Sequence, residues 1–197
     1  MLKKSLVFAT RNVNKVTELN AQVEGLFHMV TLDDIGHCEE LAEDFETLEE
    51  NARQKAVFIF EKYGFNCFSE DTGLEINVLD GRPGVHTAHY SGSRDNLQNI
   101  QKVLSEMKGK SERSARFRTV IYLILDGKHH SFEGIVRGRI AEQVSEGTQG
   151  FGYDPIFIPE GFDQTFADLP LETKKNISHR ARAVRQLIDF LMGKALH

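Results

Sequence analysis

The stretch RFRTVIYLILDG, residues 116–127, decides the fold class of this 197-residue chain. Residues 116–125 are rich in β-branched and aromatic side chains, a composition typical of a long strand. Asp126-Gly127 follows at once and is a strong signal for a two-residue hairpin turn. We therefore expect residues 131–141 to form a second strand that returns antiparallel to the first.

The segments before this hairpin read alternately as strands and helices. Short strands are predicted at residues 5–9 and 27–32, with a helix from 13 to about 24 between them. Two further strands are predicted at 67–70 and 74–79, the second ending at the Asp-Gly-Arg-Pro-Gly turn that starts at Asp80. Strands that alternate with helices require crossover connections, whereas the 116–141 segment requires a hairpin.

Three longer helices have recognisable starts or faces. Thr47-x-x-Glu50 is a capping box, and Ala52, Ala56 and Ile59 recur after it at helical spacing, followed by Phe60 and Tyr63. Residues 97–107 carry another amphipathic pattern. Ser178 can cap a last helix. The core face of that helix consists of Val184, Leu187, Ile188 and Leu191. Crossovers and hairpins together predict an α/β fold with a mixed sheet and flanking helices. We expect one domain over 1–197, with two lobes around a substrate cleft.

Composition excludes several function classes. Hydrophobic residues make up 40% and charged residues 27% of the chain, as in ordinary soluble domains, and no apolar run reaches the ~20 residues that span a bilayer. A formal net charge of −5 argues against a nucleic-acid binder. Cys38 and Cys67 show neither a zinc-site spacing nor a disulfide framework, which favours a reduced cytoplasmic protein.

The first candidate binding segment is Thr10-Arg11-Asn12-Val13-Asn14-Lys15. It follows a predicted strand and precedes a predicted helix, so its backbone N–H groups lie at a helix N-terminus, which favours anions. Thr10 and Asn12 add short polar side chains, and Lys15 adds a positive charge. The segment lacks the glycines of a Walker A loop. Taken by itself, the segment is better interpreted as a polar turn between a strand and a helix than as an anion site.

The second segment, Ser69 to Leu74, contains Glu70-Asp71-Thr72-Gly73 and is expected at the end of a strand. Mg²⁺ prefers oxygen ligands and usually takes one or two carboxylates, leaving room for water and phosphate oxygens. Asp71 can fill that role, and Thr72 can reach a phosphate. The acidic run from Glu39 to Glu46 could supply a second carboxylate, although most of that run reads as a solvated loop.

The third and fourth segments carry an aromatic face and basic groups. In Phe151-Gly152-Tyr153-Asp154-Pro155-Ile156-Phe157, the Phe151 ring at a flexible position can stack on a base, whereas Tyr153, Ile156 and Phe157 read as buried. A basic cluster surrounds the start of the last helix. Its members are Lys174, Lys175, His179, Arg180, Arg182 and Arg185, of which the last two read as solvated surface.

With these segments in place, the chain resembles the inosine/xanthosine triphosphate pyrophosphatase family. The matching motifs run from residue 9 to residue 183. They are Ala9-Thr10-x-Asn12-x-x-Lys15, Glu50-Asn51-Ala52-x-x-Lys55-Ala56, Glu70-Asp71-Thr72-Gly73-Leu74, Gly81-x-Pro83-Gly84, Ala115-Arg116-Phe117, Gly150 to Phe157, and Ser178-His179-Arg180. The sequence departs from the pattern at His89, where many relatives have arginine.

The resemblance implies an elongated mixed sheet between two lobes, a magnesium-dependent cut between the α- and β-phosphates, and a homodimer. By position, Asp71 looks like the catalytic acid and a metal ligand, with Glu43 as the second ligand. Phosphate-binding residues would be Thr10, Arg11, Asn12, Val13, Asn14, Lys15 and Lys55. Other nucleotide contacts would be Thr72, Phe151, Gly152, Tyr153, Asp154, Lys174, His179 and Arg180.

The expected reaction converts a nucleoside triphosphate and water to the monophosphate and pyrophosphate, with the deaminated purines ITP, dITP and XTP as substrates. Donors on His179 or Arg180 would suit the 6-keto group of these bases and clash with the 6-amino group of adenine. Two alternatives stay open. One is a Maf-like house-cleaning pyrophosphatase for other modified nucleotides, and the other is a non-catalytic nucleotide-binding module.

Overall fold

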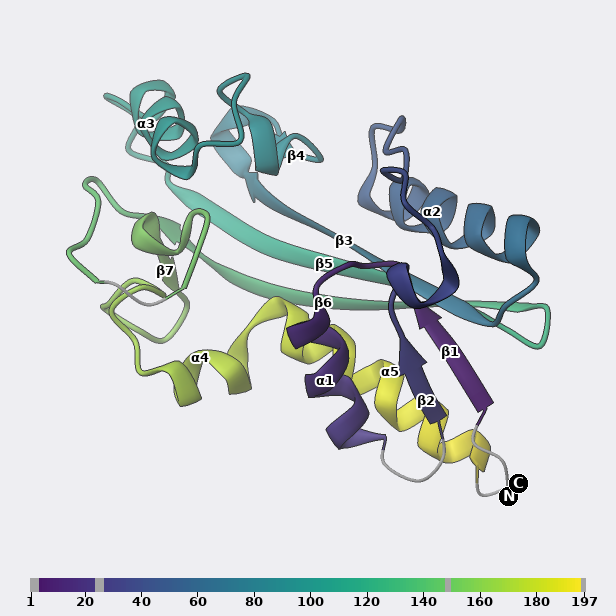
Figure 1. Ribbon diagram of the computed structural model, residues 1–197. Coiled ribbons are helices and arrows are strands. Elements are labelled where there is room, and N and C mark those ends of the chain that lie inside the picture. Colours follow the sequence, from purple (N-terminus) through teal and green to yellow (C-terminus); the bar gives the residue numbers. More distant parts are fainter. Residues whose placement is uncertain (1–3, 24–26, 148–149, 196–197) are drawn as a thin grey trace. The chain divides into compact units, whose positions relative to one another are not determined.

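A computed structural model describes residues 4–23, 27–147 and 150–195 (Figure 1). The strands are β1 (Lys4–Phe8), β2 (Phe27–Val30), β3 (Cys67–Ile76), β4 (Pro83–Gly84), β5 (Ser114–Leu125), β6 (Lys128–Ile140) and β7 (Phe157–Pro159). The α-helices are α1 (Val13–Gln22), α2 (Leu48–Tyr63), α3 (Asn96–Glu106), α4 (Leu171–Ile177) and α5 (His179–Ala195). Short 3₁₀ turns cover Asp33–Ile35, Asn77–Leu79, Thr87–His89 and Asp154–Ile156.

The strands form a mixed sheet in the order β2-β1-β3-β5-β6-β7, with β4 paired to β3. β1 runs parallel to β2 and to β3, whereas β3 pairs antiparallel with β4 and β6 pairs antiparallel with β7. Parallel neighbours require a crossover connection, which α1 provides between β1 and β2, whereas antiparallel neighbours can be joined by a short turn, as β3 and β4 are. The predicted α/β fold with a mixed sheet is therefore confirmed.

The chain divides into two compact units, each made of separate segments. Unit 1 comprises 1–71, 120–133 and 183–197, and unit 2 comprises 72–119 and 134–182. The strands β3, β5 and β6 contribute residues to both units. A single domain with a substrate cleft stays a prediction.

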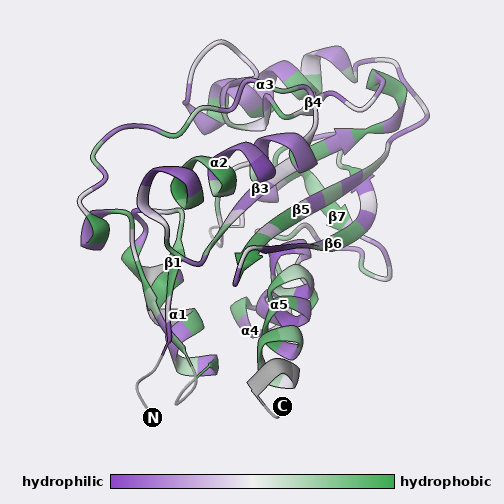
Figure 2. Ribbon diagram, turned by 90° about the vertical axis from the view of Figure 1, so that its right-hand side faces the viewer, coloured by the Kyte–Doolittle hydropathy of each residue, from purple (hydrophilic) through white to green (hydrophobic). Residues whose placement is uncertain are grey.

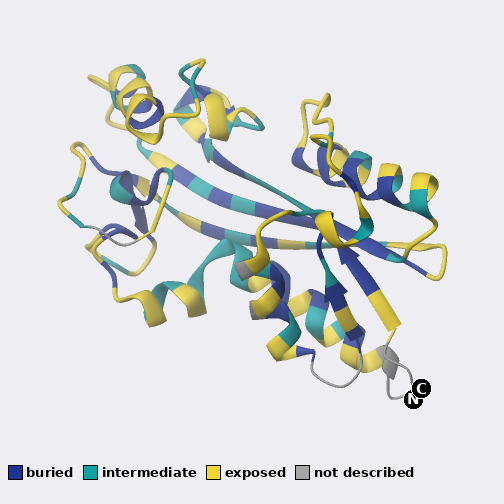
Figure 3. Ribbon diagram, viewed as in Figure 1, coloured by how far each residue is buried: buried dark blue, intermediate teal, exposed yellow. Residues whose placement is uncertain are grey.

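Unit 1 is a layered α/β structure. Leu6 and Phe8 of β1 are buried with the apolar residues of α1 and α5, whereas Val7 between them is buried with Ala56 and Ile59 of α2. Successive side chains of a strand point to opposite faces, so β1 serves two cores at once. Figure 3 shows the resulting pattern of buried strands and of helices whose outer sides are exposed. Figure 2 shows the corresponding mixture of hydrophobic and hydrophilic residues along α2.

Unit 2 has its own core. Ile100, Val103 and Met107 pack from α3 and its C-cap, and Phe117 of β5 packs against Phe157 of β7 with their ring centroids 4.7 Å apart. Tyr153 and Ile156 are also buried here, which confirms the sequence interpretation of these side chains.

Several local signals act as expected. Thr47 Oγ1 accepts a hydrogen bond from Glu50 N at 3.2 Å and donates to the Glu50 carboxylate at 2.7 Å, so the capping box starts α2. Asp126 and Gly127 have φ angles of 50° and 71°, as a type I′ hairpin turn requires. Ser178 Oγ accepts from Ala181 N at 3.2 Å and caps α5.

The Glu70–Gly73 segment does not lie at a strand end. β3 runs without interruption from Cys67 to Ile76, so the two strands predicted at 67–70 and 74–79 are one, and the prediction was wrong in this respect. Asn77–Leu79 forms a 3₁₀ turn instead of more strand. Gly81 N donates to Ile76 O at 3.0 Å and Asp80 adopts a φ of 55°, so the turn begins at Ile76 and the strand ends there instead of at residue 79.

Candidate active site

A buried ammonium group joins the predicted metal-binding residues of unit 1. Nζ of Lys55, on α2, lies 2.6 Å from Oε1 of Glu43 and 3.0 Å from Oδ1 of Asp71, and it also donates to the carbonyl of Glu70 at 2.9 Å. The Lys55 side chain is 8% exposed and that of Asp71 12%, whereas that of Glu43 is 47% exposed. We call Glu43, Lys55 and Asp71 the carboxylate–lysine cluster.

The acidic loop before α2 is fastened to that helix by two amide side chains. Asn51 accepts a hydrogen bond from Phe45 N at 2.9 Å and donates to Phe45 O at 3.0 Å. Gln54 accepts from Asp44 N at 3.0 Å and donates to its carboxylate at 2.6 Å. These four hydrogen bonds hold the backbone on which Glu43 lies. This role of Asn51 and Gln54 could not be predicted from the sequence, although Asn51 lies within the Glu50-Asn51-Ala52 family motif.

The environment of the cluster shifts two pKa values. Burial raises the pKa of Asp71 to about 6, although the Lys55 ammonium opposes the shift, and the neighbouring Glu43 carboxylate adds to it. Burial tends to lower the pKa of Lys55, but Asp71 and Glu43 together raise it above its usual value. Lys55 therefore stays charged, while Asp71 exchanges a proton near pH 6.

The oxygen atoms of the cluster fit a hard divalent cation. The carboxylates of Glu43 and Asp71 converge on the same cationic group, and Mg²⁺ usually takes one or two protein carboxylates. Among the described residues, no group of three or more His, Cys, Asp or Glu could hold a metal ion. A metal held by two carboxylates would therefore complete its coordination with water and substrate oxygens.

The first predicted phosphate-binding segment lies between β1 and α1, as expected. Thr10 Oγ1 accepts from Asn12 N at 3.1 Å, and Asn12 Oδ1 accepts from Lys15 N at 3.3 Å. Nζ of Lys15 forms an ion pair of 2.5 Å with Oε1 of Glu70, whose side chain is 9% exposed. The segment thus places a lysine at the helix start beside β3.

The remaining members of that segment have different surroundings. Arg11 donates to the carbonyl of Glu39 at 2.7 Å and forms an ion pair with Asp33 at 3.4 Å. In this structure its guanidinium group is therefore bound to protein oxygen atoms. Val13 begins α1 and is 62% exposed. The side chain of Asn14 lies outside the described part of the chain.

In unit 2, an aromatic turn presents Phe151 to solvent, with 79% of the residue exposed. Asp154 holds the turn, since its carboxylate accepts from Phe151 N at 2.7 Å and from the Lys174 ammonium. That ammonium also lies 5.5 Å from the centroid of the Phe151 ring. Burial raises the pKa of Asp154, while the hydrogen bond from Lys174 opposes the shift.

Two glycines permit this turn. Gly152 has a φ of 62°, which side-chain-bearing residues rarely adopt. A Cβ atom at Gly150 would lie 2.1 Å from the Asp154 carboxylate and 2.3 Å from the Lys174 ammonium. The Asp154–Lys174 pair can therefore form only beside a glycine. This role of Gly150 could not be predicted from the sequence, although Gly150 is the first residue of the Gly150–Phe157 motif.

The other predicted base contacts lie at the start of α5 and on β3. The His179 ring stacks on Phe117, with centroids 4.7 Å apart and planes 14° apart, and Arg180 follows in the same helical turn, partly buried. Thr72 Oγ1 shares a hydrogen bond of 2.8 Å with Thr119 Oγ1. The Tyr153 hydroxyl donates to Thr87 O at 3.0 Å, and its buried ring is not available for stacking on a ligand.

His89, the position that departs from the family pattern, ends the Thr87–His89 turn of unit 2, where its ring lies 5.5 Å from that of His86.

No helix among the described residues is both long and apolar enough to cross a membrane.

Comparison with known proteins agrees with these local features. A model of the Ham1 family matches residues 6–190. The dITP/XTP pyrophosphatase of Flavobacterium johnsoniae is 48% identical over 187 residues, covering 94% of this chain and 97% of its own. The dITP/XTP pyrophosphatase of Porphyromonas gingivalis is 48% identical over 191 residues, covering 96% and 98%.

Solved structures share the fold as well. The Ham1 protein of Staphylococcus aureus superimposes with a TM-score of 0.92 at 33% identity, covering 97% of this chain and all of its own. A Ham1 protein from Coxiella burnetii gives a TM-score of 0.91 at 31% identity, covering 96% and 99%. Because sequence and backbone agree over nearly the whole length, the chain belongs to the Ham1 family.

Proposed function

We propose that this protein hydrolyses the deaminated purine nucleoside triphosphates ITP, dITP and XTP to their monophosphates and pyrophosphate. The observation that carries the proposal is the carboxylate–lysine cluster, in which Glu43, Lys55 and Asp71 meet within 3.0 Å of one ammonium nitrogen. With a divalent cation on its two carboxylates, this cluster would carry a net positive charge and would suit a reaction whose transition state concentrates negative charge on phosphate oxygens. The names of the Flavobacterium and Porphyromonas relatives support the same substrate class.

The Thr10–Lys15 segment and Lys55 would bind the phosphates. The N–H groups at the start of α1 favour an anion, and Lys15 supplies a full charge there. Lys15 forms an ion pair with Glu70 in this structure, so a triphosphate would compete with Glu70 for the ammonium. Arg11 is bound to Glu39 and Asp33 and would have to leave them in order to contact phosphate.

Asp71 and Glu43 would hold a divalent cation, which we propose to be Mg²⁺. When bound, such an ion neutralises charge on the phosphate oxygens and on the departing pyrophosphate. Asp71 would in addition orient the attacking water through a hydrogen bond to its carboxylate. Its pKa of about 6 leaves that carboxylate largely ionised at neutral pH and able to accept a proton as a weak base.

Base recognition falls to residues of unit 2. The exposed Phe151 ring offers a stacking face to any purine. Lys174 would support this face through its contact with the ring and its ion pair with Asp154. His179 and Arg180 would donate to the 6-keto group of hypoxanthine or xanthine, a group that adenine lacks. GTP has the same 6-keto group, so its rejection requires a contact at the 2-amino position.

We also propose that the active protein is a homodimer in the cytoplasm that does not bind nucleic acid. The support for the dimer is the family resemblance. The support for the location is the free state of both cysteines, Cys38 exposed and Cys67 buried. The formal charge of −5 supports the absence of nucleic-acid binding.

The decisive experiment measures pyrophosphate release from ITP, XTP and ATP with Mg²⁺, using the wild-type chain and Asp71→Asn. We expect rapid release from ITP and XTP, slow release from ATP, and less than a tenth of the wild-type kcat in the variant, a barrier change above about 1.4 kcal/mol. Release only from modified pyrimidine or methylated nucleotides would instead favour a Maf-like enzyme. Binding of ITP without release would favour a nucleotide-binding module.

A further inference from the structure

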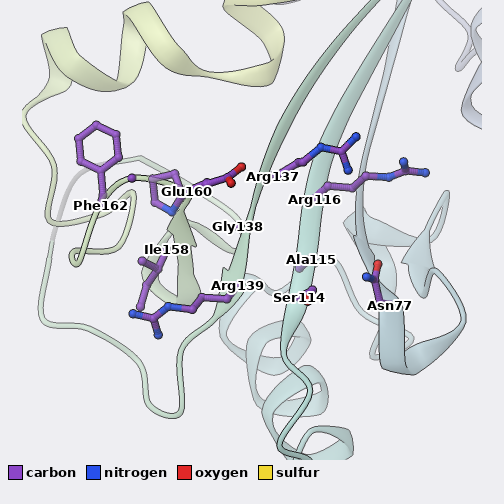
Figure 4. A pocket seen from close by; sticks show the side chains of 12 residues that line it. Asn77, Ser114, Ala115, Arg116, Arg137, Gly138, Arg139, Ile158, Glu160 and Phe162 are labelled. Atoms are coloured by element: carbon purple, nitrogen blue, oxygen red, sulfur yellow. The ribbon is translucent and has the colours of Figure 1, made fainter.

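A polar hollow lies in unit 2. Its lining residues have no role in the function proposed above. It has a volume of about 580 Å³, within the range of small-molecule sites, and is formed by β5, β6, β7 and the loop after β7 (Figure 4). Its lining includes Ser114, Arg116, Arg137, Arg139, Glu160 and Phe162. None of the residues predicted to bind the nucleotide or the metal lines it.

Two arginines stand side by side in this hollow. The turn at Asp126-Gly127 and the hydrogen bond from Ile140 N to Arg113 O, 2.9 Å long, set the register of β5 and β6. In that register Arg116 and Arg137 are opposite each other, and Figure 4 shows both side chains extending in the same direction. Like charges placed directly across a strand pair are destabilising. An arrangement of this kind is better tolerated when an anion binds between the two groups.

Carboxylates neutralise only part of this charge. Glu75 is shared, because it accepts from Nε of Arg116 at 2.5 Å and from a terminal nitrogen of Arg118 at 3.0 Å. Arg137 and Arg139 are exposed, and neither forms an ion pair with any residue that the structure describes. Glu160 is the second carboxylate here, bonded to β6 through its backbone N–H, which donates to Arg137 O at 2.9 Å.

The local balance is therefore positive in a chain of negative net charge. The hollow is lined by the guanidinium groups of Arg116, Arg137 and Arg139 and by one carboxylate, that of Glu160. Glu75 lies outside this lining and pairs with Arg116, so the charge in the hollow is positive chiefly because of Arg137 and Arg139.

We propose that the hollow binds the phosphate group of a small phosphorylated molecule. Guanidinium groups bind phosphate oxygens in a bidentate manner, and Arg116 is pre-oriented for this because Glu75 already holds its Nε. A phosphate carries about two negative charges near neutral pH and several acceptor oxygens, so it can bind more than one of these guanidinium groups at once. Ile158 and Phe162 form an apolar wall beside the charged groups, which suits an organic body attached to the phosphate.

The same phosphate chemistry could come from two sources, an inorganic anion or a nucleoside monophosphate. Amide NMR spectra of the full-length protein, titrated separately with pyrophosphate, AMP and acetate, distinguish them and report each site locally. We expect saturable shifts at Gly138, Arg139 and Gly161 with pyrophosphate or AMP and none with acetate. Shifts at Ile158 and Phe162 with AMP alone would identify the nucleotide as the source, and their absence would identify the inorganic anion.

The variant Arg137→Gln/Arg139→Gln should raise the Kd from these shifts at least tenfold, whereas Arg94→Gln, an exposed arginine of unit 2 away from the hollow, should not change it. Should the double variant lose its dispersed spectrum, Arg137→Gln alone serves in its place. Shifts at these amides that fail to saturate, or that are the same in the variants and the wild type, would overturn the proposal. Binding here does not require the proposed hydrolase activity, so loss of ITP hydrolysis would leave this test unaffected.

Discussion

Nζ of Lys55 lies 3.0 Å from Oδ1 of Asp71, although the two residues come from different elements, α2 and β3. Both side chains are nearly buried. Breaking a buried ion pair by removing one partner is far more costly than losing a surface pair, because the remaining charge stays desolvated. The pair therefore links the stability of unit 1 to the groups that we propose for metal binding.

Replacing Lys55 with alanine should destabilise the protein by about 3 kcal/mol, the lower part of the range for buried pairs, because Glu43 is half exposed and keeps part of its hydration. Urea unfolding without metal measures this change. Lys62→Ala is the matched control on the same helix, since Lys62 pairs with Glu39 at 3.7 Å and lies over the Phe58 ring with its side chain exposed, and it should cost less than about 1 kcal/mol. Equal losses in both variants would show that the cluster adds no stability.

The raised pKa of Asp71 gives the stability a defined pH dependence. The folded state, with a pKa of about 6 against the ordinary 3.8, binds this proton more tightly than the unfolded state. Stability from this group is thus fully present below pH 4 and is lost as the pH rises from about 4 to about 6. Urea unfolding should be measured for the wild type and for Asp71→Asn between pH 4 and 7.5. The difference between their free energies of unfolding should fall as the pH rises to about 6. A difference that does not vary with pH would contradict the raised pKa of Asp71.

Metal-dependent activity should follow the opposite trend. Protons compete with the cation for the Asp71 carboxylate, so the Mg²⁺ concentration needed for half-maximal ITP hydrolysis should increase as the pH falls through about 6. Rates measured at several Mg²⁺ concentrations between pH 5.5 and 8 test this. A half-maximal concentration that does not vary with pH would remove Asp71 from the proposed metal ligands.

Lys15→Ala should raise the KM for the triphosphate ITP by a much larger factor than the Kd for the monophosphate IMP. Lys15 lies at the start of α1 and forms an ion pair with Glu70 of β3, so we expect it to exchange Glu70 for a phosphate. The KM for ITP and the Kd for IMP are the two quantities to compare. Should both change by the same factor, Lys15 would act by holding the loop and not by contacting the outer phosphates.

Phe151→Ala and Arg180→Ala should separate stacking from base reading. Loss of the exposed Phe151 ring should lower kcat/KM for ITP, XTP, GTP and ATP by a similar factor, worth about 1–3 kcal/mol, without changing the melting temperature. Loss of Arg180 should instead narrow the ratio of ITP to ATP. If Arg180→Ala lowers kcat/KM by the same factor for all four substrates, the base is recognised by backbone groups of the aromatic turn instead.

Much of the local structure could be predicted from the sequence. The capping box of Thr47 and Glu50, the turn at Asp126-Gly127 and the cap at Ser178 all form as expected. Each depends on residues within a few positions of one another, so its free energy is determined by the local chain. The same holds for the mixed sheet, since helical crossovers and hairpins are encoded in consecutive segments.

The grouping of the charged residues was decided by tertiary structure. Motifs alone could identify Glu43, Lys55 and Asp71 as candidate site residues. The sequence did not show that both carboxylates contact the Lys55 ammonium. It also did not show that Asn51 and Gln54 hold the acidic loop. The continuous course of β3 through Glu70–Gly73 and the pairing of Arg116 with Arg137 were equally absent from it. Contacts between residues distant in the chain depend on strand order and register. These are fixed by burying the apolar faces of all elements together, and no single segment encodes that condition.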